Sequence, residues 1–375
     1  MNRLVLIGNG FDLAHGLKTS YNDFILWYLK KCFKTADLQI NYADQLLEIS
    51  LPYMNMQGLG RDGFNNTEEL FNELYQNDDL YAFMTAQPLH DNYKRFEIPY
   101  SITLCSTFFK KLLRDCRQMS WVEIENHYYK ELKRCLNMGD RNFQKQKLDE
   151  LNHHFKFLIV ELEAYLKTLE VPAPIPAYTE LLAHPILPDE ILNIDITEEI
   201  VRLKTMVLNF NYTSTAEHYL EAKHHTHTGQ TYAINYIHGK IEDTENPLVF
   251  GFGDELDEDY LKMEKSKVKG FFRHIKSFWY FRTENYHNLV RFLQDDQFQV
   301  YVLGHSCGLS DRTLLNMIFE HPNCMSIKIH YHGTKEANNF TSLTEEISRH
   351  FKNKVQMRDK IMPLTSSSRM PQHDD

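Results

Sequence analysis

The chain has 375 residues, of which 42% are hydrophobic, a share that is enough for one large or two modest cores. Its formal net charge of −10 argues against bulk binding to DNA or RNA, because phosphate contacts need a basic surface. The chain contains no run of about 18 apolar residues and no N-terminal secretory signal, so we expect a cytoplasmic protein without a membrane span.

The chain opens with an apolar run, Leu4 to Ile7, that stops at Gly8-Asn9-Gly10. This pattern predicts a short buried strand over 3–8 followed by a Gly-x-Gly turn, where a backbone can approach a phosphate or ribose closely. A helix is expected over 21–32, with Ser20 and Asp23 as its capping pair.

The middle of the chain, residues 40–199, lacks alternating strand patterns and is expected to form a helical insertion. Apolar residues spaced three and four apart predict amphipathic helices over 68–84, 101–117, 121–135 and 141–169. The proline-rich segment 171–177 should end a helix.

Strand patterns return in the last part of the chain, separated by helical ones. Strands are expected over 206–210, 232–238, 248–251, 299–304 and 326–331. Helices are expected over 213–222, 274–294, 310–320 and 341–351. The alternation predicts an α/β fold with a Rossmann-like, mostly parallel sheet flanked by helices. Its core would comprise residues 1–39 and 200–358, and residues 359–375 would form a flexible tail.

The first polar motif follows the first strand, and the ligand-binding residues we expect there are Gly8, Asn9, Gly10, Phe11 and Asp12. The Gly-x-Gly-x-x-Gly pattern is incomplete, since Leu13 occupies the last glycine position. Asp12 could accept a hydrogen bond from a ribose hydroxyl or cap a turn, and the motif alone leaves both roles open.

Two further motifs also lie at predicted strand ends. The segment 209–215 contains Asn211 and Thr213, which could either cap a helix or line a polar small-molecule site. His238, followed by Gly239, has the side chain best suited to proton transfer near neutral pH, although a strand-end histidine is commonly structural. Ligands of open α/β sheets bind beyond the carboxyl ends of the strands, so these residues can converge.

The fourth motif, residues 304–312, lies between a strand and a helix. Gly304, Ser306 and Asp311 offer groups for ribose or phosphate, and Ser310 or Asp311 could instead be the helix N-cap. Cys307 could be a nucleophile, but the chain's six cysteines form no Cys-x-x-Cys pair and are more simply reduced, buried thiols. No metal is expected, because His224, His225 and His227 lack an acidic or cysteine partner at a recognised spacing.

Together these motifs resemble the AbiH family of bacterial abortive-infection proteins, which act against phage. The matching segments are IGNGFDLAHGLKTSYNDF, NFNYTST, IHG, VFGFGDE and GHSCGLSDRTLL. A more distant resemblance links the chain to sirtuin-like NAD-binding domains. Gly8, Gly10, Asn211, His238 and the Gly304–Ser306 turn match that fold's pattern, whereas Asp12 and Thr213 depart from it and a paired-cysteine zinc module is missing.

The resemblances imply an anti-phage effector that binds NAD⁺ and hydrolyses its nicotinamide–ribose bond. His238 would act as the general base, and Asn211 would orient water or the ribose. The turns at 8–12 and 304–306 would hold the dinucleotide through N–H groups. The alternatives are a nucleotide-binding sensor without catalysis and a nuclease. A phage-derived trigger or a homo-oligomer could control the protein.

Overall fold

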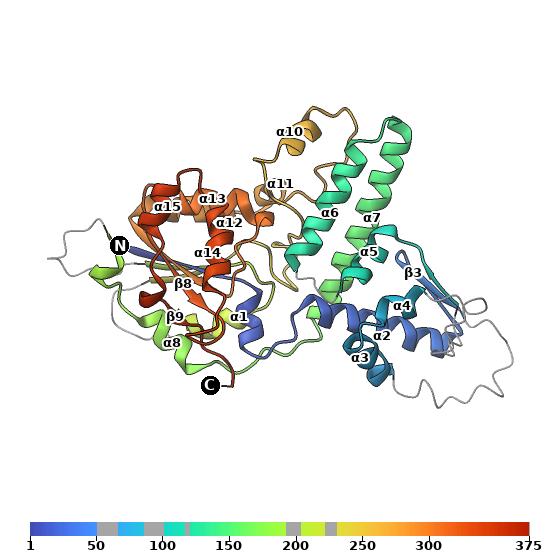
Figure 1. Cartoon of the computed structure of the whole chain (residues 1–375), viewed down its shortest axis with the longest axis horizontal. Helices are drawn as coiled ribbons and strands as arrows, with labels where there is room; N and C mark the ends of the chain where they lie inside the picture. Colours follow the sequence, from blue (N-terminus) through green and yellow to red (C-terminus); the bar gives the residue numbers. More distant parts are fainter. Residues whose placement is uncertain (51–66, 86–100, 117–120, 193–203, 222–230, 375) are drawn as a thin grey trace. The chain divides into compact units, whose positions relative to one another are not determined.

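The computed structural model describes residues 1–50, 67–85, 101–116, 121–192, 204–221 and 231–374 (Figure 1). The chain divides into two compact units. The first comprises Met1–Thr19 and Leu166–Asp375, and the second comprises Ser20–Tyr165. The second unit is therefore inserted after the first strand, and it begins and ends earlier than the expected range of 40–199.

The first unit contains a six-stranded sheet in the order β6-β5-β1-β7-β8-β9, with every neighbouring pair parallel. Its strands are β1 (Asn2–Ile7), β5 (Lys204–Asn209), β6 (Thr231–Tyr236), β7 (Phe298–Leu303), β8 (Cys324–Tyr331) and β9 (Ser368–Arg369). Every residue of β1 and β7 is buried, which requires a covering layer on both faces. The predicted α/β fold with a parallel sheet is confirmed.

Helices cover both faces of this sheet. On one face Leu6 and Val302 pack with residues of α12 (Asn285–Asp295), α13 (Arg312–Phe319) and α14 (Phe340–Ser348). On the other face Val5 and Ile7 pack with residues of α1 (Asn9–Ala14), α8 (Pro176–Ala183) and α9 (His218–Glu221). The unit also contains α10 (Glu258–Lys265), α11 (Lys276–Trp279) and α15 (Lys354–Lys360).

The strand order creates a topological switch point between β1 and β7. From β1 the chain builds the sheet through β5 to β6, and then returns to the other side of β1 to form β7 and β8. In sheets of this kind, ligands bind outside the carboxyl ends of the strands at the switch point. That edge is where the four polar motifs of the sequence fall.

The second unit is mainly helical but also contains strands that the sequence analysis did not predict. Its helices are α2 (Tyr21–Gln39), α3 (Thr67–Gln76), α4 (Leu80–Thr85), α5 (Thr107–Asp115), α6 (Trp121–Leu136) and α7 (Arg141–Leu166). A three-stranded antiparallel sheet is formed by β2 (Asn41–Ala43), β3 (Leu47–Ser50) and β4 (Ser101–Leu104). These strands are too short to show a periodic pattern. The capping pair of Ser20 and Asp23 at the start of α2 is confirmed.

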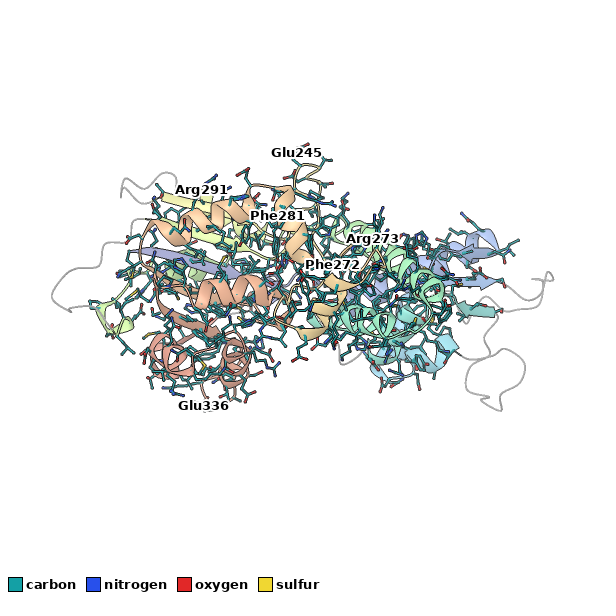
Figure 2. The ribbon with its side chains drawn as sticks, turned by 90° about the horizontal axis from the view of Figure 1, so that it is seen from above. Glu245, Phe272, Arg273, Phe281, Arg291 and Glu336 are labelled. Atoms are coloured by element: carbon teal, nitrogen blue, oxygen red, sulfur yellow. The ribbon has the colours of Figure 1, made fainter. Side chains whose placement is uncertain are left out.

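Other segments also differ from expectation. The predicted helix over 101–117 begins with the strand β4, and the predicted helix over 68–84 is divided into α3 and α4. Residues 248–251 form a loop instead of a strand, and the adjacent Phe252 makes only an isolated bridge with Ile275. The predicted helix over 274–294 is divided into α11, a 3₁₀ turn over Tyr280–Arg282, and α12. Its aromatic residues divide as well, since Tyr280 is buried whereas Phe281 lies on the surface (Figure 2).

The last residues do not form a free tail. Ser368 and Arg369 of β9 pair with His330 and Tyr331 of β8, and the following Met370 is buried. The backbone N–H of His373 donates to the carbonyl of Ala14 at the end of α1 (2.7 Å). The polar composition of residues 359–375 concealed the buried side chains of Met362 and Met370 and the backbone hydrogen bonds that hold the segment.

Candidate functional site

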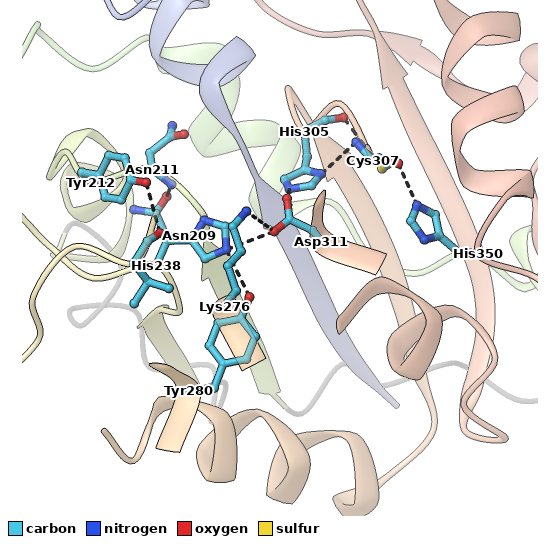
Figure 3. Close-up of polar contacts among 11 residues, drawn as sticks. Asn209, Asn211, Tyr212, His238, Lys276, Tyr280, His305, Cys307, Asp311 and His350 are labelled. Carbon is cyan, nitrogen blue, oxygen red and sulfur yellow. Dashed lines mark hydrogen bonds and ion pairs between the residues drawn. The ribbon is translucent and has the colours of Figure 1, made fainter. Parts of the chain in front are cut away.

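The four sequence motifs meet at the carboxyl edge of the sheet, because all the strands that carry them are parallel. Gly8 follows β1, Asn211 follows β5, His238 follows β6, and Gly304 follows β7. Figure 3 shows the polar contacts among the side chains gathered there. The predicted convergence of residues from opposite ends of the chain is thus present in the structure.

The turns after β1 and β7 lie directly against each other. A Cβ on Gly8 would lie 2.6 Å from Cα of His305, and one on Gly304 would lie 2.2 Å from the backbone nitrogen of Phe11. Gly304 also has a φ of +69°, which glycine adopts readily. The glycines are therefore required for the contact between the two turns.

N–H groups of the first turn that were predicted to hold a dinucleotide are already hydrogen-bonded, within the turn or to the end of β7 and the turn after it. The N–H groups of Gly8, Gly10 and Phe11 donate to the carbonyls of Leu303 (3.3 Å), Gly304 (2.8 Å) and Gly8 (2.9 Å). A phosphate could bind these groups only if those hydrogen bonds opened. The side chain of Phe11 is also buried, 4.8 Å from the ring of Tyr178, so it belongs to the core.

Asn211 connects the end of β5 to the turn after β1. Its side-chain nitrogen donates to the carbonyl of Gly8 (3.0 Å), and its backbone N–H donates to the side chain of Asn209 (3.0 Å). Both asparagines are buried. The polar residues of the segment 209–215 thus fasten the edge of the sheet and do not simply cap a helix.

Asp12 is a buried carboxyl group with one oxygen unused. The hydroxyl of Thr213 donates to Oδ2 of Asp12 (2.6 Å), and Thr215 donates in turn to Thr213 (3.3 Å). Oδ1 is buried and has no hydrogen-bond partner among the described residues. Burial raises the pKa of Asp12 to about 6, although the hydrogen bond from Thr213 opposes this rise.

Asp311 is the centre of a second buried cluster (Figure 3). Its Oδ1 lies 2.8 Å from Nζ of Lys276 and 3.1 Å from Nε2 of His238. Burial alone would raise the pKa of Asp311, but the charge of Lys276 and the contact with His238 outweigh it and hold the pKa well below its ordinary value. Asp311 is also the N-cap residue of α13, yet its side chain makes no capping hydrogen bond.

His238 is buried beside Asp311, and the balance of its surroundings lowers its pKa below the ordinary value. Burial and the charge of Lys276 lower its pKa, whereas Asp311 and a backbone hydrogen bond with Phe210 act in the opposite direction. A neutral imidazole carries one N–H and cannot donate to two acceptors, so a second proton would satisfy both Asp311 and Phe210. The hydroxyl of Tyr280 lies 3.4 Å from Nε2 of His238.

His305 approaches the other side of Asp311. The N–H of Cys307 donates to Nδ1 of His305 (3.0 Å), so the hydrogen of the neutral ring belongs on Nε2. Nε2 lies 3.7 Å from Oδ2 of Asp311. Burial lowers the pKa of His305 to about 4, which keeps the ring neutral at physiological pH.

Cys307 is not placed to act as a nucleophile. Its side chain is fully buried in the apolar core, and this burial raises the pKa of the thiol. Its φ of +54° lies in the left-handed region, which is unusual for a residue with a Cβ. Its carbonyl accepts a hydrogen bond from Nε2 of His350 (2.7 Å).

The loop that precedes Lys276 is fastened to the start of α13. Arg312 lies 3.1 Å from the carboxylate of Asp254, and the hydroxyl of Thr313 donates to the carbonyl of Gly253 (2.9 Å). The backbone N–H of Lys276 donates to the carbonyl of Phe252 (2.9 Å). The segment 249–255, which the sequence analysis matched to the family, therefore positions Lys276.

Only part of this cluster was predicted from the sequence. The remaining predicted residues lie on the turns, where Ser306 is exposed and Asn9 is partly exposed. Lys276, Tyr280, His305 and His350 were not predicted. His305 carried a usable signal, because it also follows a strand, whereas nothing in the local sequence distinguishes Lys276 from the neighbouring surface lysines.

Within the described residues, no group of three or more His, Cys, Asp or Glu side chains could hold a metal ion. His224, His225 and His227 lie outside the described residues. None of the described helices has both the length and the apolar character needed to cross a bilayer.

The fold and the site define a doubly wound α/β protein with a buried Asp–His–Lys cluster at the carboxyl edge of its sheet. Residues 4–332 match the family model described as "Bacteriophage abortive infection AbiH", and the chain therefore belongs to the AbiH family. Membership implies a part in abortive infection, the defence against bacteriophage for which the family is named. No curated protein matches the chain.

Proposed function

We propose that this chain binds NAD⁺ at the carboxyl edge of its sheet and hydrolyses the nicotinamide–ribose bond. The observation that carries the proposal is the contact between His238 and Asp311, 3.1 Å apart, at the end of β6 and beside the β1–β7 switch point. It pairs a candidate general base with a carboxylate that orients it, at the position where doubly wound sheets bind nucleotides.

The reaction that we propose is balanced by water alone. The bond between the ribose C1′ and the nicotinamide nitrogen breaks, and its electron pair leaves with nicotinamide. Water forms the new C1′–O bond and gives a proton to Nδ1 of His238, because Nε2 already donates to Asp311. The products are nicotinamide, ADP-ribose and one proton. Asp311 stabilises the resulting imidazolium, because it stays ionised beside Lys276.

Two other residues would hold the reacting ribose. The side-chain nitrogen of Asn211 donates to the carbonyl of Gly8. We propose that its side-chain oxygen binds the attacking water or a ribose hydroxyl. Asp12 has a buried Oδ1 without a partner among the described residues, which is the acceptor that a ribose hydroxyl requires. Thr213 holds the other oxygen of Asp12 and so orients the carboxyl group.

Binding would also involve the turns over 8–12 and 304–306. Because Gly10 donates to Gly304 across them, we propose that the two turns separate when the dinucleotide enters. Asn9 and Ser306 are the side chains of these turns that a ligand can reach first, since they are partly or fully exposed. Entry that requires this opening offers one way to keep the enzyme silent before infection.

The test is to incubate the purified full-length protein with NAD⁺, alone and with lysate from phage-infected cells, and to quantify nicotinamide. Wild type should release nicotinamide under at least one condition, and the His238→Gln variant should not. His330→Gln is the matched control, because His330 is buried on β8, two strands from β1 in the sheet, where it contacts Ser368 (2.9 Å). Binding of NAD⁺ without nicotinamide release under every condition would indicate a sensor instead of a hydrolase. The absence of both binding and release would refute the proposal.

A further inference from the structure

We propose that His350 is a positioning residue of this site, which fixes the tautomer and orientation of His305 through the backbone of Cys307. The consequence for activity rests on the proposed function, whereas the positioning itself does not. The residues form a continuous chain of contacts from the end of α14 to Asp311, as Figure 3 shows.

The first contact fixes the peptide that follows Cys307. A carbonyl oxygen can only accept, so His350, 2.7 Å away, must donate from Nε2. His350 is 1% exposed, and its Nδ1 is buried without a partner among the described residues. The backbone carbonyl of His350 is itself held by the side-chain nitrogen of Asn316 on α13 (2.6 Å). The donor therefore has little freedom to move.

The second contact depends on the unusual backbone of Cys307. Its φ of +54° is disfavoured for a residue with a side chain, and such a conformation persists only where the surroundings enforce it. The hydrogen bond from His350 to the carbonyl and the burial of the Cys307 side chain are two such restraints. In this conformation the N–H of Cys307 points back to Nδ1 of His305, 3.0 Å away.

The third contact joins His305 to Asp311, the centre of the buried cluster. With Nδ1 occupied as an acceptor, the neutral ring of His305 carries its hydrogen on Nε2, which faces Oδ2 of Asp311 at 3.7 Å. Oδ1 of the same carboxylate faces Lys276 and His238. Loss of the His350 donor would free the peptide at Cys307, and His305 would then lose its fixed tautomer and its orientation toward Asp311.

The direct test is the tautomer of His305 in the ¹⁵N-histidine-labelled full-length protein, measured from long-range ¹H–¹⁵N NMR spectra. Its signals are assigned by their loss in His305→Gln. Wild type should show the Nε2–H form. His350→Phe keeps the ring volume but removes the donor, and should shift the His305 signals toward a mixture of tautomers. His350→Gln keeps an N–H donor and should preserve the wild-type signals.

Cys307→Gly provides an independent arm, because glycine adopts a positive φ without the restraint that a Cβ needs. The change in the His305 signals caused by His350→Phe should therefore be smaller in the Cys307→Gly background. His330→Phe, at a buried histidine bonded to Ser368, is the control and should leave the His305 signals unchanged. Unaltered His305 signals in folded His350→Phe would overturn the proposal. If that variant does not fold, loss of the Nε2–H form in His350→Gln would overturn it instead.

Enzyme activity is a second measurement, and its result can refute the proposed function without refuting the role of His350. If the protein hydrolyses NAD⁺, His350→Phe should lower kcat about tenfold or more with little change in KM, and His350→Gln should restore it. A protein without hydrolase activity would refute the proposed function and leave the NMR result as it stands. An unchanged tautomer in an active enzyme would refute the role of His350 alone.

Discussion

The ammonium nitrogen of Lys276 lies 2.8 Å from Oδ1 of Asp311, and both side chains are almost completely buried. Two charges held away from water stabilise each other only as a pair, because either one alone would lose its hydration without compensation. The pair also keeps the carboxylate ionised where His238 contacts it.

The first prediction concerns this ion pair. Lys276→Met should lower the free energy of unfolding by about 3–5 kcal/mol, because it leaves the charge of Asp311 buried and unpaired. The double variant with Asp311→Asn should recover part of that loss. Lys240→Met is the control, since its pair with Glu217 (2.7 Å) is partly exposed and should contribute less than about 1 kcal/mol. Equal losses in the two single variants, measured by urea denaturation, would contradict the buried pair.

The second prediction concerns the pH dependence of stability at Asp12. Its pKa is raised from 3.8 to about 6, so folding favours the protonated carboxyl. The stability it contributes is complete below about pH 4 and is lost as the pH rises through 6. At pH 8 the buried carboxylate should cost up to about 3 kcal/mol.

Asp12→Asn should therefore raise the thermal midpoint at pH 8 and change it little at pH 4. Asp254→Asn is the opposite control, because it removes a carboxylate that pairs with Arg312 and should lower the midpoint at pH 8. A lower thermal midpoint for Asp12→Asn than for wild type at pH 8 would contradict this prediction, because it would show that the fold stabilises the carboxylate.

The third prediction concerns the contact between the two glycine turns. Gly304→Ala should destabilise the protein by at least about 1–3 kcal/mol, since its Cβ would lie 2.2 Å from the backbone nitrogen of Phe11 and its φ is positive. Gly139→Ala is the control, because nothing lies within 4 Å of a Cβ there. Chemical denaturation should separate the two variants clearly, and similar midpoints would argue against the turn contact.

The fourth prediction concerns the C-terminal segment. Deletion of residues 368–375 should lower the thermal midpoint by several degrees, because it removes β9, the buried Met370 and the hydrogen bond from Tyr178 to the carbonyl of Pro371 (2.9 Å). Deletion of residues 374–375 alone should leave the midpoint unchanged. A flexible tail, as the composition suggested, would make the two deletions equivalent.

The sequence predicted the large parallel sheet well, because its buried strands are continuous apolar runs such as Leu4–Ile7. It failed where a structure depends on distant backbone contacts. β9 is two residues long and exists only because β8 offers an edge, and β3 pairs with β4 about 50 residues further along the chain. Pattern and propensity contain no information on such pairing.

The same distinction applies to the site. Strand-end motifs predicted that His238, Asn211 and Asp12 lie at one edge of the sheet, because parallel topology brings strand ends together. Lys276 was missed, since its burial follows from a loop fastened by Arg312 and Thr313, far along the chain. The turns over 8–12 and 304–306 were predicted to hold a dinucleotide, and only the folded chain reveals that their glycines also bring two backbones into contact.

The measurement that tests the central claim most directly is nicotinamide release from NAD⁺ by wild type and by His238→Gln, with NAD⁺ binding measured in parallel by calorimetry. We predict that wild type releases nicotinamide, either alone or with lysate from phage-infected cells, and that the variant binds NAD⁺ with similar affinity but reacts at least about 100-fold more slowly. A variant that hydrolyses NAD⁺ at the wild-type rate would contradict the role of His238, and a wild type that neither binds nor cleaves NAD⁺ would contradict the whole account.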